Sequence, residues 1–432
     1  MKKWREWVTL FWKKIKSGLI QILSASALNK IITMVSGMVI TRILSKEVYG
    51  EWSIVLNIYS YFNLISALGL SNGAFQFGAE NQKSNKEYAY CSYCLKRGIV
   101  VNVVLILLGL LYANVRRFSV VGTGLFLSFY LPMLMLEYVM NSCLVILRCE
   151  NRIKEYARVL NVNTVLFAVG TCVGAFWGIV GVILGRYLAY IISILYLFKM
   201  MGLELERVKN AEKLQKQEIR SLWKFSLIAC LSSAMNSLLY LIDVTMVTDY
   251  IASAEQTAVY KVATIIPNAL NFIPSSIMIA VLPTLIANNK NRQWLKYNVK
   301  KYYFALGLLN IIILAGTVMM APIVIRIVAG DKYDASIPVF KILMIGYAIS
   351  STFRILSANI LFGMKKIHIN MVVNLIAGLG DIALNMHYIP MIGMRGAAIA
   401  TVLSETIASV LAFCTVIYYI YLKEGDQHGA MC

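Results

Sequence analysis

Twelve apolar segments, most of them long enough to cross a lipid bilayer, constrain this chain more than any other feature of its sequence. The hydrocarbon core of a bilayer is roughly 30 Å thick and needs about 20 apolar residues per α-helix. Because backbone polar groups cannot stay unpaired in lipid, each segment is expected to be helical. The predicted transmembrane helices are residues 19–44, 52–75, 98–113, 120–147, 159–175, 178–198, 225–249, 259–285, 302–328, 338–364, 369–389 and 396–422.

The basic residues are distributed unequally between the loops. The net charge is +20, but Lys and Arg lie in short breaks between apolar runs rather than on one polar face, so nucleic-acid binding is not indicated. Only 14% of the 432 residues are charged, against roughly 25% in soluble domains. One set of alternate loops and termini holds 29 of the 41 Lys and Arg residues, and the other holds 5. The positive-inside rule therefore predicts a multi-pass protein of the cytoplasmic (plasma) membrane with both termini in the cytoplasm.

The chain is predicted to consist of two six-helix halves. The sequence GIVGVILG begins at Gly178, and a similar GMRGAAIA begins at Gly393. We expect an amphipathic cytoplasmic helix over residues 1–18, an N-lobe over 19–198, a cytoplasmic linker over 199–224, a C-lobe over 225–422 and a cytoplasmic tail over 423–432. Because six is even, both halves would have the same orientation, an arrangement found in transporters.

Cysteine and histidine offer no metal site. Cys91 and Cys94 form one Cys-x-x-Cys pair without a second pair at metal-binding spacing, and the three histidines are scattered. No metal and no cofactor are expected, apart from H+ or Na+ as a coupling ion.

Two stretches of the sequence resemble a known family. The stretch from Leu28 to Gln76 contains Arg-x-Leu-Ser at Arg42, Tyr-Gly at Tyr49, an aromatic-rich second helix and Leu-Gly-Leu at Leu68. It resembles the opening of the bacterial polysaccharide repeat-unit flippases of the O-antigen and capsule type. The distal stretch IPMIGMRGAAIATVLSE, from Ile389 to Glu405, is similar to that family's penultimate loop and last helix. These motifs are helix-packing patterns, so they indicate a family rather than a substrate.

The resemblance implies membership of the multidrug/oligosaccharidyl-lipid/polysaccharide exporter superfamily. Such proteins are all-α, with about 12 transmembrane helices in two six-helix lobes around a central cavity, and they work by alternating access. The flippase branch moves oligosaccharides attached to a polyprenyl diphosphate. The implied partners are the lipid-linked substrate, membrane lipids, a polysaccharide polymerase and glycosyltransferases.

Several basic and amide residues within the predicted helices are candidates for substrate binding. A charge at bilayer depth costs at least ~2.5–3.5 kcal/mol, so it needs a partner, a wet cavity or a function. Guanidinium and ammonium groups could bind a diphosphate, and amides could bind sugar hydroxyls. The candidates are Lys30, Arg186, Arg354, Lys261, Asn29, Asn141, Asn236 and Asn359. The alternative is that the bases form interhelical ion pairs with buried acids.

Three acidic residues near mid-depth are candidates for ion coupling: Asp381, Glu405 and Glu137. A buried carboxyl can bind H+ or Na+ in one state and release it in another. Asp381 ranks first because its predicted helix has no Lys or Arg. Asp243, in contrast, lies nearer a helix end, where we expect snorkelling to bring the charge to water.

The eighth apolar segment contains Pro267, Pro274 and Pro283, which predict a bend or hinge. A transporter rather than an enzyme is expected. One alternative is a cation-coupled multidrug exporter on the same fold. A second is a membrane-embedded polysaccharide polymerase or glycosyltransferase, which the short predicted outer loops disfavour.

Overall fold

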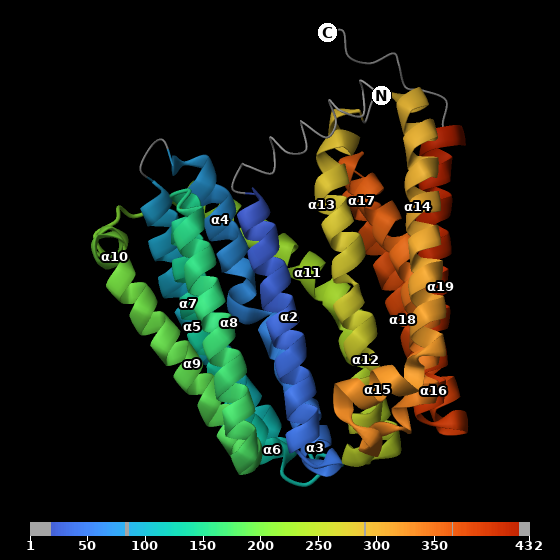
Figure 1. The fold of residues 1–432 in the computed structure, drawn as a ribbon. Coiled ribbons are helices and arrows are strands. Elements are labelled where there is room, and N and C mark those ends of the chain that lie inside the picture. Colours follow the sequence, from blue (N-terminus) through green and yellow to red (C-terminus); the bar gives the residue numbers. More distant parts are fainter. Residues whose placement is uncertain (1–18, 83–85, 289–290, 365, 423–432) are drawn as a thin grey trace. The chain divides into compact units, whose positions relative to one another are not determined.

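A computed structural model describes residues 19–82, 86–288, 291–364 and 366–422, all of which are helical or lie in short connections (Figure 1). The predicted segments over residues 1–18 and 423–432 lie outside this range. The α-helices are α2 (Leu19–Ile43), α3 (Lys46–Leu64), α4 (Leu70–Glu80), α5 (Glu87–Val115), α6 (Thr123–Tyr130), α7 (Met133–Cys149), α8 (Ile153–Gly174), α9 (Gly178–Met200), α10 (Gly202–Lys209), α11 (Lys216–Ile251), α12 (Ala254–Leu270), α13 (Phe272–Ala287), α14 (Arg292–Met319), α15 (Ala321–Ala329), α16 (Ser336–Ile349), α17 (Ile355–Gly363), α18 (Ile367–Ile392) and α19 (Met394–Ile417). Short helical turns are η1 (Ser66–Gly69), η3 (Ala175–Trp177), η4 (Asp331–Tyr333), η5 (Ser350–Arg354) and η6 (Tyr418–Leu422).

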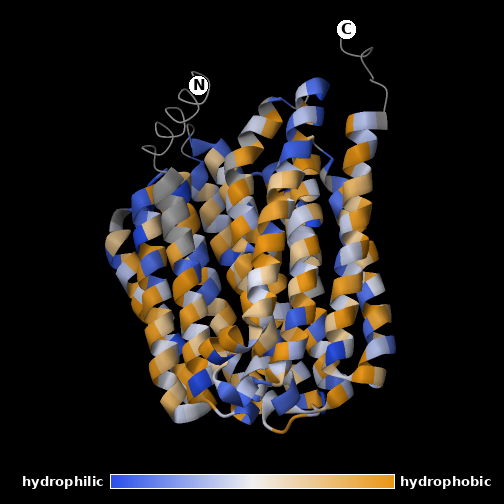
Figure 2. Cartoon of the chain, turned by 45° about the vertical axis from the view of Figure 1, so that its right-hand side comes forward, coloured by the Kyte–Doolittle hydropathy of each residue, from blue (hydrophilic) through white to orange (hydrophobic). Residues whose placement is uncertain are grey.

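The predicted all-α, polytopic membrane fold is confirmed. Each of the twelve predicted segments coincides with one helix or with one broken helix, such as α3–α4 or α16–α17. Within the described residues, eight stretches are long and apolar enough to cross a membrane. Hydrophobic residues cover most of the length of these helices, as Figure 2 shows. Three helix starts were predicted about ten residues too late: the third helix begins at Glu87 rather than Gly98, the seventh at Lys216 rather than 225, and the ninth at Arg292 rather than 302. The added turns of α5 pack in the N-unit core through Tyr90 and Cys91, whereas Lys216 and Gln217 at the start of α11 are exposed.

The chain divides into two compact units, Met1–Ser237 and Leu238–Cys432, here called the N-unit and the C-unit. The division falls within α11. In the N-unit the core includes Tyr90, Tyr138, Leu147 and Leu197. The core of the C-unit includes the buried residues Leu306, Leu356, Ile360 and Val416. The segment predicted as a linker contains α10 and the first turns of α11.

The second membrane helix is broken between α3 and α4. Ala67 and Leu68 have φ angles of 47° and 50°, which are left-handed values that side chains disfavour. Asn102 of α5 supports this break: its Oδ1 accepts hydrogen bonds from the Ala67 backbone N–H at 2.8 Å and from Ser66 Oγ at 3.2 Å. The Asn102 side chain is fully buried. The Leu-Gly-Leu motif of the sequence therefore marks an interrupted helix.

Replacing Asn102 with Leu should destabilise the protein, because the Ala67 N–H would lose its acceptor inside the N-unit. An unsatisfied buried donor costs about 1–3 kcal/mol. The thermal unfolding temperature of the purified protein in detergent should therefore fall. Asn114→Leu is the matched control, since Asn114 is exposed and its amide bonds only to its own helix at Leu110. Equal unfolding temperatures for Asn102→Leu and wild type would refute this role.

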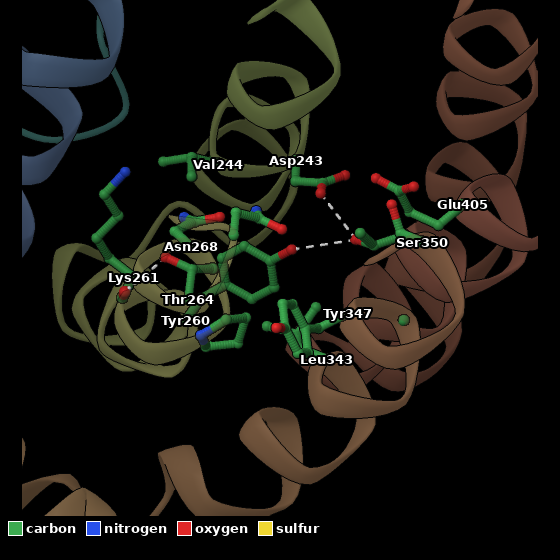
Figure 3. A pocket seen from close by; sticks show the side chains of 14 residues that line it. Asp243, Val244, Tyr260, Lys261, Thr264, Asn268, Leu343, Tyr347, Ser350 and Glu405 are labelled. Carbon is green, nitrogen blue, oxygen red and sulfur yellow. Dashed lines mark hydrogen bonds between the residues drawn. The ribbon is translucent and has the colours of Figure 1, made fainter. Parts of the chain in front are cut away.

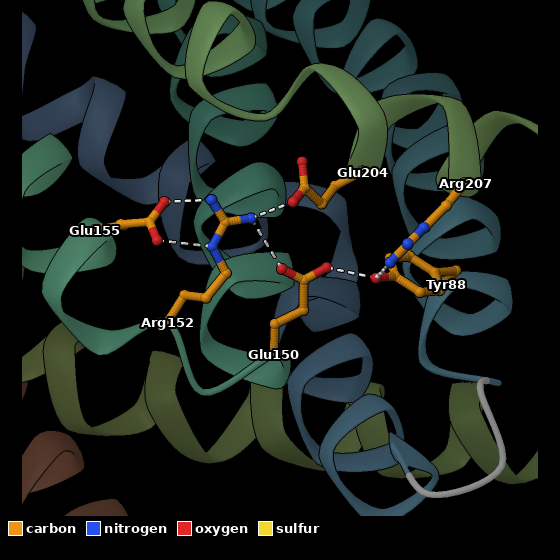
Figure 4. A network of polar contacts seen from close by, with 6 residues as sticks. All are labelled: Tyr88, Glu150, Arg152, Glu155, Glu204 and Arg207. Atoms are coloured by element: carbon orange, nitrogen blue, oxygen red, sulfur yellow. Dashed lines mark hydrogen bonds and ion pairs between the residues drawn. The ribbon is translucent and has the colours of Figure 1, made fainter.

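A polar network joins the connection between α7 and α8 to α5 and α10 (Figure 4). Arg152 forms ion pairs with Glu155, Glu150 and Glu204. The hydrogen bond that Arg152 donates to Glu155, together with the other carboxylates, raises the pKa of this guanidinium. Tyr88 donates a 2.6 Å hydrogen bond to Glu150 and accepts one from Arg207 at 3.1 Å. The network therefore fixes four chain segments at one end of the N-unit.

Two helices of the C-unit deviate from regular α geometry. The proline-rich eighth segment is divided into α12 and α13 at Asn271, which agrees with the predicted bend. Between α16 and α17, residues Ser350–Arg354 form a π-helical turn. The buried amide of Asn310 on α14 donates hydrogen bonds to Ser351 Oγ at 3.0 Å and Thr352 Oγ1 at 2.9 Å in this turn. Such π turns often occur at functional sites.

Candidate functional site

Two buried carboxylates, Asp243 on α11 and Asp381 on α18, lie together inside the C-unit. The amide of Asn385 donates hydrogen bonds to both, at 2.9 Å to Asp243 Oδ1 and 3.1 Å to Asp381 Oδ2. Asp381 and Asn385 are four residues apart and therefore share one face of α18. The exposed fractions of Asp243, Asp381 and Asn385 are 5%, 1% and 0%. The pair is thus shielded from bulk solvent.

Hydroxyl groups complete the surroundings of the pair. On α19, Thr401 Oγ1 donates to Asp243 Oδ2 at 2.7 Å and Ser404 Oγ donates to Asp381 Oδ1 at 2.9 Å. The Tyr260 hydroxyl of α12 lies 3.4 Å from Thr401 Oγ1. Among the described residues, no Lys or Arg forms a salt bridge with either aspartate. Two adjacent buried carboxylates repel each other when both are charged. A shared proton or a bound cation would therefore stabilise the pair.

A small cavity adjoins the carboxylate pair (Figure 3). Its free volume is about 60 Å³, which is enough for a few water molecules or one small cation. The polar residues that line it are Asp243, Tyr260, Lys261, Thr264, Asn268, Asn271, Tyr347, Ser350, Thr401 and Glu405. In Figure 3 the Lys261 ammonium points away from Asp243 and Glu405. The carboxylate, hydroxyl and amide oxygens among these residues are the donors that hard cations prefer. The described residues contain no cluster of three or more His, Cys, Asp or Glu suited to a metal ion.

Arg354 and Glu405 form an ion pair beside this cavity. Arg354 belongs to the π-helical turn, and its Nε lies 2.8 Å from Glu405 Oε2 and 3.0 Å from Ser350 Oγ. The two residues are 8% and 9% exposed. Arg354, a predicted substrate-binding base, is therefore paired with Glu405, a predicted coupling acid. This pairing matches the alternative in which buried bases form interhelical ion pairs instead of binding substrate.

In the N-unit the predicted base Arg186 lies inside a cage of aromatic rings. Its guanidinium carbon lies 4.5 Å from the ring centre of Phe167 and 4.8 Å from that of Trp52. Arg186 Nη1 donates to the Tyr130 hydroxyl at 2.9 Å, and its Nε donates to Thr171 Oγ1 at 3.3 Å. Such cation–π contacts stabilise a guanidinium that has left water. With 8% of its surface exposed, Arg186 has little area for contact with a substrate.

The other predicted residues are dispersed. Glu137 on α7 accepts a 3.2 Å hydrogen bond from Asn63. Asn141, one helical turn further along α7, is exposed, as is Lys30 on α2. The Asn29 amide, also on α2, is buried with no hydrogen-bond partner among the described residues. The Asn359 amide donates to the Ile355 carbonyl oxygen of its own helix at 2.8 Å. The side chain of Asn236 lies outside the described part of the chain.

Sequence reasoning missed four members of the carboxylate cluster: Asp243, Asn385, Thr401 and Ser404. The expectation that Asp243 reaches water by snorkelling is wrong, because its carboxylate is buried and bonded to two neighbouring helices. The four-residue spacing of Asp381 and Asn385 was the available signal.

The family model described as "Polysaccharide biosynthesis protein" matches residues 15–289. The chain belongs to this family. No curated protein matches the chain by sequence.

Solved structures with the fold of this polysaccharide biosynthesis family member include transporters and a flippase. An inward-facing multidrug resistance MATE family transporter of the MOP superfamily has a TM-score of 0.70 at 12% identity, over 91% of this chain and 94% of that one. The lipid II flippase MurJ in an inward closed conformation has a TM-score of 0.72 at 12% identity, over 91% and 87%. A MOP superfamily transporter from Pyrococcus furiosus has a TM-score of 0.62 at 14% identity, over 93% and 94%. These similarities show that the chain shares the fold of these transporters and of this flippase.

Proposed function

We propose that this protein is a flippase that moves polyprenyl-diphosphate-linked oligosaccharide repeat units across the cytoplasmic membrane for surface polysaccharide synthesis. The observation that carries this proposal is the family match over residues 15–289. The similarity of the fold to that of a lipid II flippase supports a lipid-linked cargo. Both termini would be cytoplasmic, and glycosyltransferases and a polymerase would act before and after it.

Transport is proposed to be coupled to H+ or Na+ at the carboxylate pair of Asp243 and Asp381. The pair has neutral hydrogen-bond donors around it and an adjoining cavity of about 60 Å³. Binding of a cation would cancel the like-charge repulsion, and its release would restore that repulsion. The conformation of α11, α18 and α19 would therefore depend on occupancy, which is the differential interaction that coupling requires. Glu405, paired with Arg354, and Glu137, bonded to Asn63, are the less favoured coupling sites.

Multidrug export is the second candidate function, because a MATE family transporter has the same fold. The two functions predict different results when the gene is deleted in its host. Loss of a flippase should leave polyprenyl-linked oligosaccharide accumulated on the inner face of the membrane and remove the surface polysaccharide. Loss of a drug exporter should change neither, but should increase sensitivity to organic cations. Normal surface polysaccharide without lipid-linked accumulation would refute the flippase proposal.

A further inference from the structure

A second cavity lies within the N-unit, beside the break between α3 and α4. Its free volume is about 320 Å³, within the range of roughly 300–1,000 Å³ that is typical of small-ligand sites. Its polar lining includes Asn63, Asn72, Glu137, Asn141, Arg148 and Tyr156. Neither the family match nor the fold comparison assigns a role to this cavity.

Two glycines bring the first half of α11 against this cavity. Gly69 has a φ of +75°, and a Cβ there would lie 2.4 Å from the Ser226 carbonyl oxygen. A Cβ on Gly73 would lie 2.1 Å from Ser226 Oγ. Because the clash at Gly69 would be with the backbone of α11, only glycine permits this close approach of the α3–α4 break to α11. The same approach places Cys230 and Ser233 in the cavity wall.

The lining is suited to sugar hydroxyl groups. Asn63, Asn72 and Asn141 each carry both a donor and an acceptor, and the Glu137 carboxylate accepts hydrogen bonds. Sugar hydroxyls need both kinds of partner. Asn72 and Asn141 are exposed, and neither side chain has a hydrogen-bond partner within the described residues. Their amides are therefore available to a ligand.

The residue at the other end of the cavity is suited to a phosphate. Arg148, in the last turn of α7, lies with its guanidinium carbon 3.8 Å from the ring centre of Phe75 and 5.7 Å from that of Tyr156. It is exposed and forms no ion pair with any described residue. A guanidinium that packs against aromatic rings and has no carboxylate partner retains N–H groups that can bind phosphate oxygens.

The chemical character of the cavity lining therefore changes along α7, from hydrogen-bonding groups for sugar hydroxyls near Glu137 to a guanidinium for phosphate at Arg148. Glu137 and Arg148 are eleven residues apart, which corresponds to roughly 16 Å along a helix. Arg148 lies next to the connection that carries Arg152, at the end that the charge distribution predicts to be cytoplasmic. The anionic part of a ligand would bind there, and its sugar part would extend along α7 toward Glu137.

We propose that this cavity binds the carbohydrate head of a lipid-linked saccharide, with Asn72 and Asn141 at sugar hydroxyls and Arg148 at a phosphate. This proposal rests on the proposed flippase function and specifies where the substrate's sugar is recognised. It requires that the N-unit distinguish a glycosylated lipid from its sugar-free counterpart. Phosphate binding alone would give no such distinction.

The test is retention of the host's own lipids by the purified full-length protein. Wild type and variants are produced in the host lacking its chromosomal copy, purified in mild detergent, and the bound lipids are quantified by mass spectrometry. Wild type should retain polyprenyl-diphosphate-linked oligosaccharide. The double variant Asn72→Ala, Asn141→Ala loses two hydrogen bonds, so it should retain about tenfold less. Its retention of sugar-free polyprenyl diphosphate should match wild type, whereas Arg148→Ala should reduce both lipids.

Two exposed residues outside the cavity, Asn114 and Arg158, provide the controls Asn114→Ala and Arg158→Ala, which should retain both lipids normally. Because Asn72 and Asn141 make no hydrogen bonds with other described residues, their removal should not impair folding; an unchanged unfolding temperature verifies this. If wild type retains the glycosylated lipid and the double variant retains it equally, the cavity proposal fails and the flippase proposal stands. If wild type retains no polyprenyl-linked lipid, the flippase proposal fails.

Discussion

Replacement of either Asp243 or Asp381 with Asn should abolish ion-driven transport while leaving the protein folded. Each substitution removes one of the two carboxylates that would share a bound proton or Na+. A membrane potential of 100 mV supplies about 2.3 kcal/mol per translocated charge. Loss of one coupled charge should therefore lower the steady-state ratio of flipped to unflipped lipid about fiftyfold at that potential. Folding should be maintained, because the substitution also removes the repulsion between two buried carboxylates.

The measurement is the steady-state ratio of flipped to unflipped polyprenyl-linked oligosaccharide in proteoliposomes with a membrane potential of about 100 mV, under an imposed Na+ gradient or, separately, a pH gradient. The gradient that accelerates wild type identifies the coupling ion. Asp334→Asn is the matched control, since Asp334 is an exposed aspartate paired with Arg326 at the surface of the same unit. It should respond to the gradient as wild type does. Gradient-driven flipping by both Asp243→Asn and Asp381→Asn would exclude this pair as the coupling site.

The sequence predicted the helices of this fold and the bend in its proline-rich eighth segment, but not the other irregularities. Apolar length and backbone hydrogen bonding determine where a chain can cross lipid. The distribution of Lys and Arg between the apolar segments then indicates which ends of the helices are cytoplasmic. The break at Ala67 and Leu68 was not predictable in this way. Neither residue favours a left-handed conformation, and the break is supported by Asn102, a buried residue of a different helix. A tertiary contact therefore overrides the local preference.

The candidate sites were predicted only in part. The position of a residue along an apolar segment gives its depth in the membrane, but not the helix face on which it lies. Asp381 was singled out as an acid without a basic residue in its own helix. Its partner Asp243 is on α11, and the hydroxyls that bond to the pair are on α19. The pairing of Arg354 with Glu405 likewise depends on how α19 packs against the π-helical turn. These relations are set by packing between helices, which leaves no periodic signal in one sequence.

Breaking the Arg354–Glu405 pair should destabilise the protein more than the loss of Asn102 or of either aspartate. Glu405→Gln takes the carboxylate partner away from a guanidinium that is 8% exposed, and removal of one partner from a buried pair costs about 3–5 kcal/mol. The variant should unfold at a much lower temperature in detergent and accumulate poorly in the membrane. Arg326→Ala is the control, because Arg326 forms an exposed pair with Asp334 and its loss should hardly change the unfolding temperature.

The double variant Arg354→Met, Glu405→Leu separates the structural from the substrate-binding role of Arg354. Replacement of a whole buried ion pair by apolar residues is often neutral or stabilising, so the unfolding temperature should recover. If Arg354 serves only as the partner of Glu405, flipping should recover with it. If its guanidinium binds the diphosphate when the C-unit changes conformation, the double variant should be stable but inactive. We expect the first result, because Arg354 is already bonded to both Glu405 and Ser350 and breaking these contacts would cost more than one phosphate contact returns. A stable, inactive double variant would instead restore Arg354 as a substrate-binding residue.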